Sequence, residues 1–164
     1  PKKVFLSLTV TFFLLFVFCG PLSAEPVQPG PKDRCPLCGM FVAAYPDWVA
    51  QIEFKDGSRE FFDGPKDLFR FYLGLPEANN PRSREAVAHV YVTEYYSTKL
   101  MEAESLLYVR GSDVLGPMGK EMIPVQGRKP AETFKQDHNG EDIFSFDQIT
   151  LEALPSMTMH HSDK

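Results

Sequence analysis

The sequence predicts an α+β fold of two ββαβ units, in which helices pack on antiparallel-rich sheets. Three observations support this prediction: short segments of strand-forming residues, a tight turn between the first two of them, and two stretches with helical spacing of apolar residues. The order strand, strand, helix, strand occurs twice along the 164 residues. We therefore expect one folded domain over residues 35–151, with halves at about 45–95 and 104–149.

A β-hairpin begins the first unit. Apolar residues alternate with other residues over positions 48–54, and Trp48 and Phe54 fall on the same face, which indicates a strand. The sequence Lys55-Asp56-Gly57-Ser58 then supplies a tight turn. Residues 59–62 are expected to form the second strand of this hairpin.

A helix and a third strand complete this unit. Asp63 is suited to cap the helix, and Pro65 is suited to its first turn. Apolar residues recur at helical spacing up to Leu73, and Gly74 is expected to end the helix. Residues 87–93 are rich in β-forming side chains and predict the closing strand.

The second unit repeats the same order of elements. Residues 105–110 and 122–126 are expected to form a pair of strands. Pro130 is expected to open a short helix that Asn139-Gly140 closes. Residues 143–146 predict the last strand. Pro65 and Pro130 thus open equivalent helices, although the two units share no sequence motif.

Residues 1–24 have the pattern of a secretory signal peptide. Two lysines precede an apolar run over residues 4–19, and small residues follow up to Ala24, where cleavage is expected. The run is short for the roughly 20 residues that a membrane-spanning helix needs. We therefore expect an exported, periplasmic protein. Lipid attachment at Cys19 is an alternative that the bulky Phe18 disfavours, because lipoprotein signals carry a small residue at that position.

The two ends of the expected mature chain are predicted to lie outside the folded domain. Residues 25–34 are rich in proline and are expected to form a flexible linker. Residues 152–164 are expected to form a disordered tail that carries Met157, Met159, His160 and His161.

Charge and cysteine content narrow the classes of function. Loss of residues 1–24 removes two lysines and no acidic residue, so the mature chain is more negative than the −5 of the full sequence. It has no basic stripe, which argues against binding to nucleic acid. Two cysteines remain after the signal, in an oxidising compartment where such a pair forms a disulfide, exchanges disulfides or binds metal.

The motif Cys35-Pro36-Leu37-Cys38-Gly39-Met40 indicates which of these roles the cysteines have. Thiolates and thioethers are soft donors, and they select Cu(I) over the hard cations that carboxylates prefer. Cys35, Cys38 and Met40 are therefore predicted to bind a single Cu(I) ion. Gly39 would allow the backbone to fold tightly around that ion.

Other roles for a Cys-x-x-Cys pair remain open at this point. A structural zinc site needs four protein ligands, which here would have to include His89, His138, His160 or His161. A thiol–disulfide reductase usually places this motif at the start of a helix, whereas here it follows a proline-rich linker. A disulfide across so short a loop would stabilise little through chain entropy, and no histidine follows Cys38 for covalent haem attachment.

Met118 is predicted to complete the copper site from a distance. It lies in Gly116-Pro117-Met118-Gly119, a turn in which its side chain is free to project. A neutral thioether adds coordination without adding charge, which suits an ion that must later be released. Met122 is a weaker candidate, since a strand position indicates core packing. His89 lies inside a strand and is expected to be a structural histidine.

At the level of ordered motifs, the chain resembles the NosL family. Besides the cysteine motif, the resemblance rests on Phe54-Lys55-Asp56-Gly57, Phe61-Phe62-Asp63-Gly64, Tyr91-Val92-Thr93, Gly116-Pro117-Met118-Gly119, and Pro130-Ala131-Glu132-Thr133-Phe134 with Asn139-Gly140. These motifs occur in order from Cys35 to about Ile149.

The resemblance implies a periplasmic Cu(I)-binding metallochaperone, and not an enzyme, that helps to assemble the copper centres of nitrous oxide reductase. Its partners would be that copper-receiving enzyme and a membrane copper-export or assembly complex. The family also implies two ββαβ units and relatives in the organomercurial lyase superfamily, whose catalytic cysteines are not recognisable here. The alternatives are a periplasmic thiol–disulfide reductase that maintains copper ligands and a zinc-stabilised binding module.

Overall fold

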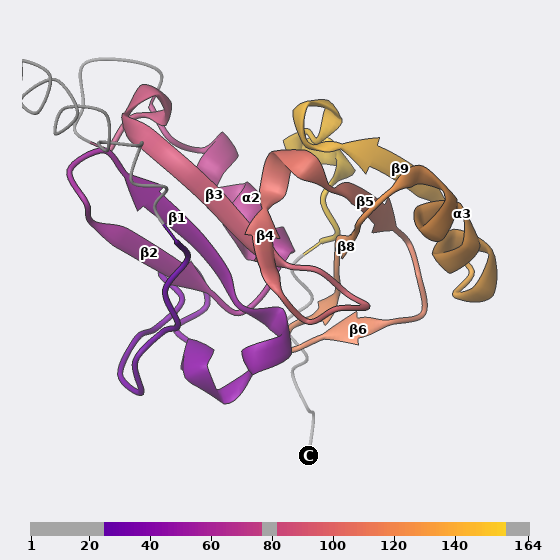
Figure 1. Ribbon diagram of the computed structural model, residues 1–164, viewed down its shortest axis with the longest axis horizontal. Coiled ribbons are helices and arrows are strands. Elements are labelled where there is room, and N and C mark those ends of the chain that lie inside the picture. The colour runs from indigo at the N-terminus through magenta and orange to yellow at the C-terminus, as the bar shows by residue number, and fades with distance from the viewer. Residues whose placement is uncertain (1–24, 77–81, 157–164) are drawn as a thin grey trace, which may run out of the picture.

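The computed structural model describes residues 25–76 and 82–156, which form two adjoining α+β halves (Figure 1). The predicted fold class is confirmed, because each half contains a ββαβ unit with an antiparallel sheet. Within these two ranges, no helix is long and apolar enough to cross a membrane. The predicted signal peptide and the residues from 157 onwards lie outside the described residues.

The first half contains a four-stranded sheet in the order β2-β1-β3-β4, and every pair of neighbouring strands is antiparallel. Its elements are β1 (Ala50–Phe54), β2 (Arg59–Phe62), α2 (Pro65–Leu73), β3 (Val87–Thr93) and β4 (Leu100–Glu102). The turn between β1 and β2 forms as expected: Gly57 has a φ of 82°, which glycine adopts without strain, and Ser58 hydrogen-bonds Asp56.

The second half contains a three-stranded antiparallel sheet in the order β8-β5-β9 and a separate small hairpin. Its elements are β5 (Leu107–Arg110), β6 (Leu115–Gly116), β7 (Gly119–Lys120), β8 (Ile123–Val125), α3 (Arg128–Asp137) and β9 (Asp142–Ser145). Helix α3 packs on β5 and β9. The hairpin of β6 and β7 carries Met118 in its turn and lies towards the first half (Figure 1).

Short 3₁₀ helices connect these elements and shape the ends of both halves. They span Val42–Ala44, Pro46–Trp48, Arg84–Ala86, Ala103–Ser105, Phe146–Gln148 and Leu151–Ala153.

The larger core cluster is shared between the two halves. Phe69 of α2 packs edge-on against Tyr108 of β5, with ring centroids 4.8 Å apart, and also contacts Phe146. Tyr108 and Met122 from the second half are fully buried in this cluster together with Cys35. Because the same apolar cluster joins both halves, the cysteine motif is attached to a common core.

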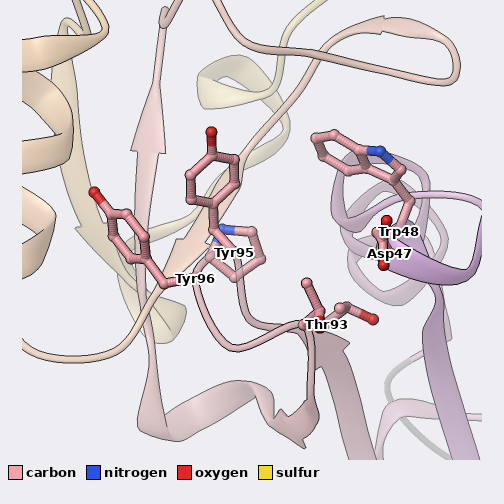
Figure 2. A pocket seen from close by; sticks show the side chains of 7 residues that line it. Asp47, Trp48, Thr93, Tyr95 and Tyr96 are labelled. Atoms are coloured by element: carbon pink, nitrogen blue, oxygen red, sulfur yellow. The ribbon is translucent and has the colours of Figure 1, made fainter.

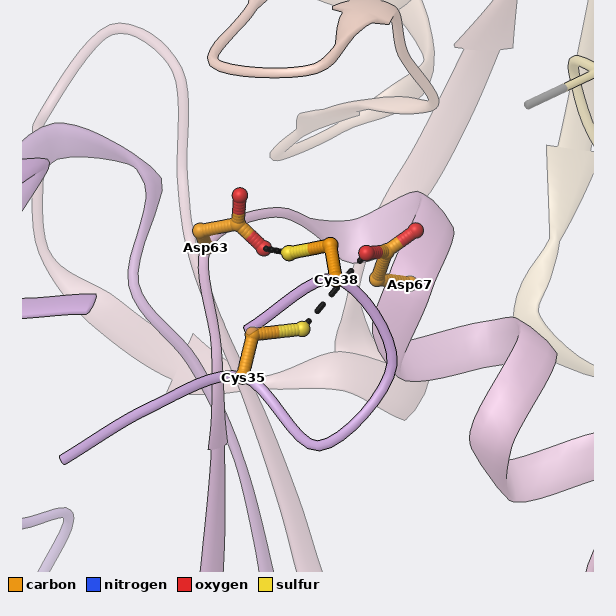
Figure 3. A group of neighbouring side chains, drawn as sticks. All are labelled: Cys35, Cys38, Asp63 and Asp67. Atoms are coloured by element: carbon orange, nitrogen blue, oxygen red, sulfur yellow. Dashed lines mark hydrogen bonds between the residues drawn. The ribbon is translucent and has the colours of Figure 1, made fainter. Parts of the chain in front are cut away.

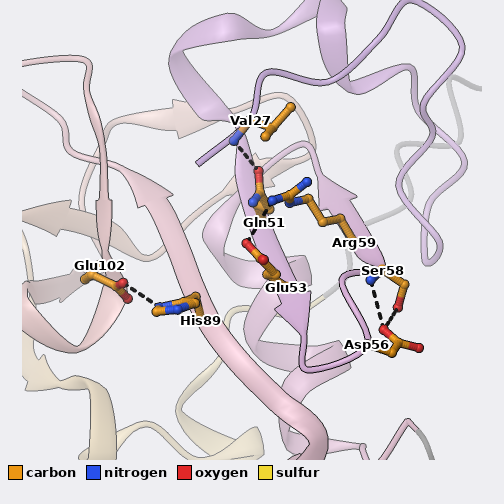
Figure 4. Close-up of polar contacts among 8 residues, drawn as sticks. All are labelled: Val27, Gln51, Glu53, Asp56, Ser58, Arg59, His89 and Glu102. Atoms are coloured by element: carbon orange, nitrogen blue, oxygen red, sulfur yellow. Dashed lines mark hydrogen bonds and ion pairs between the residues drawn. The ribbon is translucent and has the colours of Figure 1, made fainter. Parts of the chain in front are cut away.

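Strand β1 is buried on both faces, although its sequence alternates. Gln51 and Glu53 point away from the apolar face and are 0 % and 8 % exposed. Both side chains have polar partners: the N–H of Val27 in the linker donates to Gln51 Oε1 at 3.1 Å, while Arg59 of β2 forms an ion pair with Glu53 (Figure 4). The proline-rich segment thus contacts the domain that it precedes.

Two elements begin at different positions from those expected. Trp48 lies in a 3₁₀ helix and not in the strand, because Pro46 favours a helical turn at its first position. Helix α3 begins at Arg128, two residues before Pro130. The first turn of a helix tolerates proline, which has no N–H, because the backbone N–H groups of that turn have no partner within the helix. The end of α2 before Gly74 agrees with the expectation.

The expected disordered tail is wrong in its first residues. Leu151–Ala153 form a 3₁₀ helix, and Leu154 is 8 % exposed and belongs to the shared core cluster. The guanidinium of Arg70 on α2 donates to the carbonyl of Pro155 at 2.8 Å. The Leu154 side chain in the core cluster and the Pro155 carbonyl bonded to Arg70 hold this segment against the folded domain.

Candidate metal centre

The cysteine motif forms a closed loop between the linker and the first 3₁₀ helix. An isolated β-bridge joins Arg34 to Phe41 on either side of the loop. Inside it, the N–H of Cys35 donates to Met40 O and the N–H of Gly39 donates to Cys35 O, both at 2.9 Å. Gly39 has a φ of 76°, a conformation that costs glycine little. This backbone geometry turns the thiols of Cys35 and Cys38 towards the interior of the first half.

Two aspartates face the thiols (Figure 3): Asp63 lies between β2 and α2, and Asp67 lies in the first turn of α2. The thiol of Cys38 donates to Asp63 Oδ1 at 3.2 Å, and the thiol of Cys35 donates to Asp67 Oδ2 at 3.5 Å. One sulfur or oxygen atom from each of the four side chains lies within 4.8 Å of the others. The fold therefore gathers two sulfur and two oxygen donors around one position.

The aspartates are buried without enough hydrogen-bond partners. Asp63 is 2 % exposed and Asp67 is 3 % exposed. Their second oxygens, Asp63 Oδ2 and Asp67 Oδ1, are buried and have no hydrogen-bond partner in the structure. An unsatisfied buried carboxylate oxygen costs free energy, so a cation near the thiols would relieve a cost that the fold otherwise carries.

Burial also controls the protonation of the two thiols. Desolvation is the main cause that raises the pKa of Cys35 to about 11, with a smaller contribution from the charge of Asp63. Desolvation likewise raises the pKa of Cys38 well above its usual range, and its hydrogen bond to Asp63 acts in the same direction. Both side chains are free thiols in this structure. Both thiols are therefore protonated at neutral pH.

The two predicted methionine ligands lie on separate segments, the cysteine loop and the β6–β7 hairpin. Met40 is half-buried at the end of the cysteine loop, where its carbonyl bonds Cys35. Met118 is half-buried in the turn of the β6–β7 hairpin, and its carbonyl accepts a hydrogen bond from Lys66 Nζ at 2.9 Å. Because Lys66 precedes Asp67 on helix α2, the turn of Met118 adjoins the helix that supplies one carboxylate. Their role as metal ligands stays a prediction.

The weaker candidates from the sequence have other contacts. Met122 is 0 % exposed and fills the shared core, as a strand residue should. His89 pairs with Glu102 at 2.8 Å (Figure 4), and His138 pairs with Asp113 at 3.1 Å. Among the described residues, neither histidine belongs to the group around the cysteines. His160 and His161 lie outside the described residues.

Sequence reasoning missed Asp63 and Asp67 as members of the site. Asp63 was expected to cap helix α2, but the N-cap residue is Gly64 and no side chain at that position caps the helix. A capping carboxylate and a metal-site carboxylate look alike in Asp-Gly-Pro. The four-residue spacing of the two aspartates was the available signal, since it brings both to the same side of a helix start.

The comparisons with known proteins agree with this geometry. The family model NosL matches residues 26–154, which is most of the chain. This chain belongs to the NosL family. In this family member the match includes the cysteine loop, both aspartates, the Met118 hairpin and the buried residues up to Leu154.

Two similar proteins carry names that mention copper. The chain is 26 % identical over 145 residues to the copper-binding lipoprotein NosL of Stutzerimonas stutzeri, covering 82 % of this chain and 73 % of that protein. It also resembles the crystal structure of the copper chaperone NosL from Shewanella denitrificans, with a TM-score of 0.65 and 25 % identity. That match covers 79 % of this chain and 98 % of the solved chain.

Proposed function

We propose that this NosL-family chain is a metallochaperone that binds one Cu(I) ion as cargo and delivers it to a copper enzyme. Cys35 and Cys38 supply the two thiolates, and Met40 and Met118 supply thioether donors. The observation that supports this proposal most directly is the pair of thiols held within one four-residue group whose ligand atoms lie within 4.8 Å of one another. Thiolate and thioether sulfur form the ligand class that Cu(I) prefers.

The two aspartates help to hold and release the ion. They accept the hydrogen bonds of the thiols. When Cu(I) binds, the thiol protons leave and the carboxylate charges attract the cation through a poorly solvated interior. Carboxylate oxygen is a hard donor and adds little covalent affinity for Cu(I). The ion is therefore retained by two sulfurs and remains exchangeable.

Delivery requires that the site be reachable by a partner. Cys38, Met40 and Met118 are half-buried, so an incoming ligand can approach the sulfur atoms from solvent. Leu37 is 39 % exposed and Phe41 is 44 % exposed beside them. Exposed apolar side chains around a metal position suit transient contact with a recipient protein. We propose nitrous oxide reductase as that recipient, together with a membrane assembly complex, from the family membership.

Export forms part of the same proposal. The Stutzerimonas relative is named a lipoprotein, and residues 1–24 of this chain have the pattern of a signal peptide. We place the protein in the periplasm with a mature start near Glu25. Mass spectrometry of the protein from cell fractions tests this, because a lipid-modified Cys19 at the N-terminus would show membrane anchoring instead.

Metal analysis under anaerobic conditions tests the binding proposal. Wild type titrated with Cu(I) should retain one equivalent against a chelator, and Cys35→Ser/Cys38→Ser should retain none while its circular dichroism spectrum stays unchanged. An unchanged copper stoichiometry in the double variant would overturn the proposal. Transfer of the retained copper to a metal-free recipient enzyme, followed by its absorption spectrum, tests delivery.

A structural zinc site is a second candidate that one observation favours. The sequence left a histidine to complete the zinc ligands, whereas Cys35, Cys38, Asp63 and Asp67 together supply two sulfurs and two oxygens. Zinc in structural sites has four protein ligands. If zinc stabilised the domain, Asp63→Asn and Asp67→Asn would lower zinc affinity and the unfolding midpoint together, whereas Cu(I) retention through sulfur would persist.

The thiol–disulfide reductase alternative is less favoured by the site. Reactive cysteines in such enzymes have lowered pKa values, because the thiolate is the attacking species. Here burial raises the pKa of Cys35 to about 11. The cysteine loop also precedes a 3₁₀ helix and not the N-terminus of an α-helix.

A further inference from the structure

The N-terminus of helix α2 is capped by a side chain from the other half of the molecule. Glu121 follows strand β7 and is 3 % exposed. Its Oε1 accepts hydrogen bonds from the N–H of Lys66 and, at 2.9 Å, from the N–H of Met122. The first amides of a helix have no partner within the helix, and a carboxylate there is favourable. Glu121 therefore performs the capping role that was expected of Asp63.

Two glycines leave room for this carboxylate. A Cβ atom on Gly64 would lie 2.3 Å from Glu121 Oε2. The φ of Gly64 is 177°, an extended conformation open to any residue, so the requirement for glycine is one of space. A Cβ on Gly116 would lie 3.3 Å from the same oxygen. The two Gly-containing motifs, Phe61-Phe62-Asp63-Gly64 and Gly116-Pro117-Met118-Gly119, thus meet at Glu121.

Lys66 makes the reciprocal contact from helix α2 to the hairpin. It is 1 % exposed, and its Nζ donates to Met118 O at 2.9 Å and to Lys120 O at 3.0 Å. These carbonyls belong to the turn and the second strand of the β6–β7 hairpin. The helix residue therefore bonds the hairpin backbone, while Glu121, directly after the hairpin, bonds the helix backbone.

From this reciprocal arrangement we infer that Lys66 and Glu121 are positioning residues that hold the Met118 turn against the helix start that faces Cys35 and Cys38. The inference deepens the proposed copper function and rests on it. Burying a lysine and a glutamate is costly, and apolar residues of similar volume often give equal or greater stability. Their contacts instead fix the register between the two halves, which share the site.

A double-mutant cycle separates positioning from general stability. Lys66→Met keeps the length and the apolar part of the side chain and removes only the three N–H donors. Met118→Leu removes only the thioether. If Lys66 acts by placing Met118, Lys66→Met should weaken Cu(I) retention about as much as Met118→Leu, on the order of tenfold, and the double variant should lose no more than Met118→Leu alone. Lys129→Met, on the exposed surface of α3, is the matched control and should retain copper like wild type.

The number of sulfur ligands around the ion distinguishes a positioning role from a general loss of stability, because destabilising the fold does not by itself remove a ligand. X-ray absorption of the Cu(I) form should show one sulfur fewer in Lys66→Met than in wild type.

Trp48, the single tryptophan of the chain, reports on the position of the hairpin, because its ring lies close to Gly116: a Cβ on Gly116 would lie 3.4 Å from that ring. Its ring also borders a pocket that Tyr95 and Tyr96 line from the other side (Figure 2). Its emission should shift in metal-free Lys66→Met.

A second pair of variants keeps the test decisive if Lys66→Met does not fold. Glu121→Ala removes the cap and should weaken retention, whereas Glu121→Gln keeps a carbonyl oxygen that can accept the Lys66 N–H and should restore most of it. Independent losses in Lys66→Met and Met118→Leu that multiply in the double variant would overturn the inference, as would wild-type retention in both Lys66→Met and Glu121→Ala. Copper retained by Cys35→Ser/Cys38→Ser would instead refute the proposed function itself.

Discussion

The thiol of Cys38 donates a hydrogen bond to Asp63 Oδ1 at 3.2 Å, across 25 positions of sequence. This contact places a proton acceptor beside a half-buried thiol and adds to the rise that desolvation causes in the pKa of that thiol. The effect of this contact on the reactivity of the Cys38 thiol can be measured without any metal.

Asp63→Asn should make Cys38 more reactive in the metal-free, reduced protein. The amide removes the negative charge that opposes the thiolate, so the pKa of Cys38 falls and its alkylation by iodoacetamide accelerates, roughly threefold to tenfold at pH 8. Mass spectrometry of quenched samples gives the rate for each cysteine. Asp137→Asn, on the exposed surface of α3, should react like wild type. Equal Cys38 rates in Asp63→Asn and wild type would show that the carboxylate does not act on the thiol.

Cu(I) affinity should rise with pH. Burial raises the pKa of Cys35 to about 11 and that of Cys38 further, so both thiols are protonated between pH 6 and 9 and each must lose its proton to bind the ion. Every proton released contributes about a tenfold gain in affinity per pH unit, until the pH exceeds the pKa of the thiol. Competition titrations across this range, corrected for protonation of the chelator, measure the slope.

The matched variant for the pH experiment has one thiol. Cys35→Ser leaves a single proton to release, so its weak residual affinity should depend on pH with about half the slope of wild type. An affinity of wild type that stays constant from pH 6 to pH 9 would contradict binding through the two protonated thiols.

Met118→Leu should weaken Cu(I) retention while preserving the fold. Leucine keeps the bulk and apolar character of methionine, so the free energy of unfolding should change by less than about 1 kcal/mol. Competition against a Cu(I) chelator under anaerobic conditions measures the retention. Met122→Leu is the control, because Met122 is fully buried in the core and should leave retention unchanged.

Met40→Leu belongs in the same experiment. A chelator curve for Met118→Leu that coincides with that of wild type would remove Met118 from the site. A larger loss in Met40→Leu would mean that the cysteine loop closes on the ion with its own methionine.

Gly64→Ala should destabilise the protein by about 1–3 kcal/mol, because the new methyl group would overlap Glu121 Oε2 and force the cap of α2 to move. Urea denaturation measures the change in midpoint. Gly30→Ala is the control: its Cβ would lie 3.4 Å from Asp33 Oδ2, an ordinary contact, and should change stability by less than about 0.5 kcal/mol. A Gly64→Ala midpoint equal to that of wild type would show that Glu121 has room to shift.

Local patterns were sufficient for the order of elements. Alternation and the Asp56-Gly57 turn predicted the hairpin of β1 and β2, and helical spacing after Pro65 predicted α2. Boundaries were less well determined where two local signals compete, as at Trp48, where Pro46 favours a helical turn within an alternating segment. The small hairpin of β6 and β7 was expected only as a turn, because two-residue strands leave no periodic pattern.

The sequence by itself determined which soft donors the protein has, since Cys35, Cys38 and Met40 lie within one short motif and their chemistry does not depend on the fold. Only the tertiary structure decided what surrounds them. Asp63 and Asp67 reach the thiols across 25 and 32 positions, and Glu121 reaches Lys66 across 55. A carboxylate that caps a helix and one that faces a thiol cannot be told apart in a sequence. Their roles differ because the packing of the two halves sets which backbone or side-chain donor each oxygen meets.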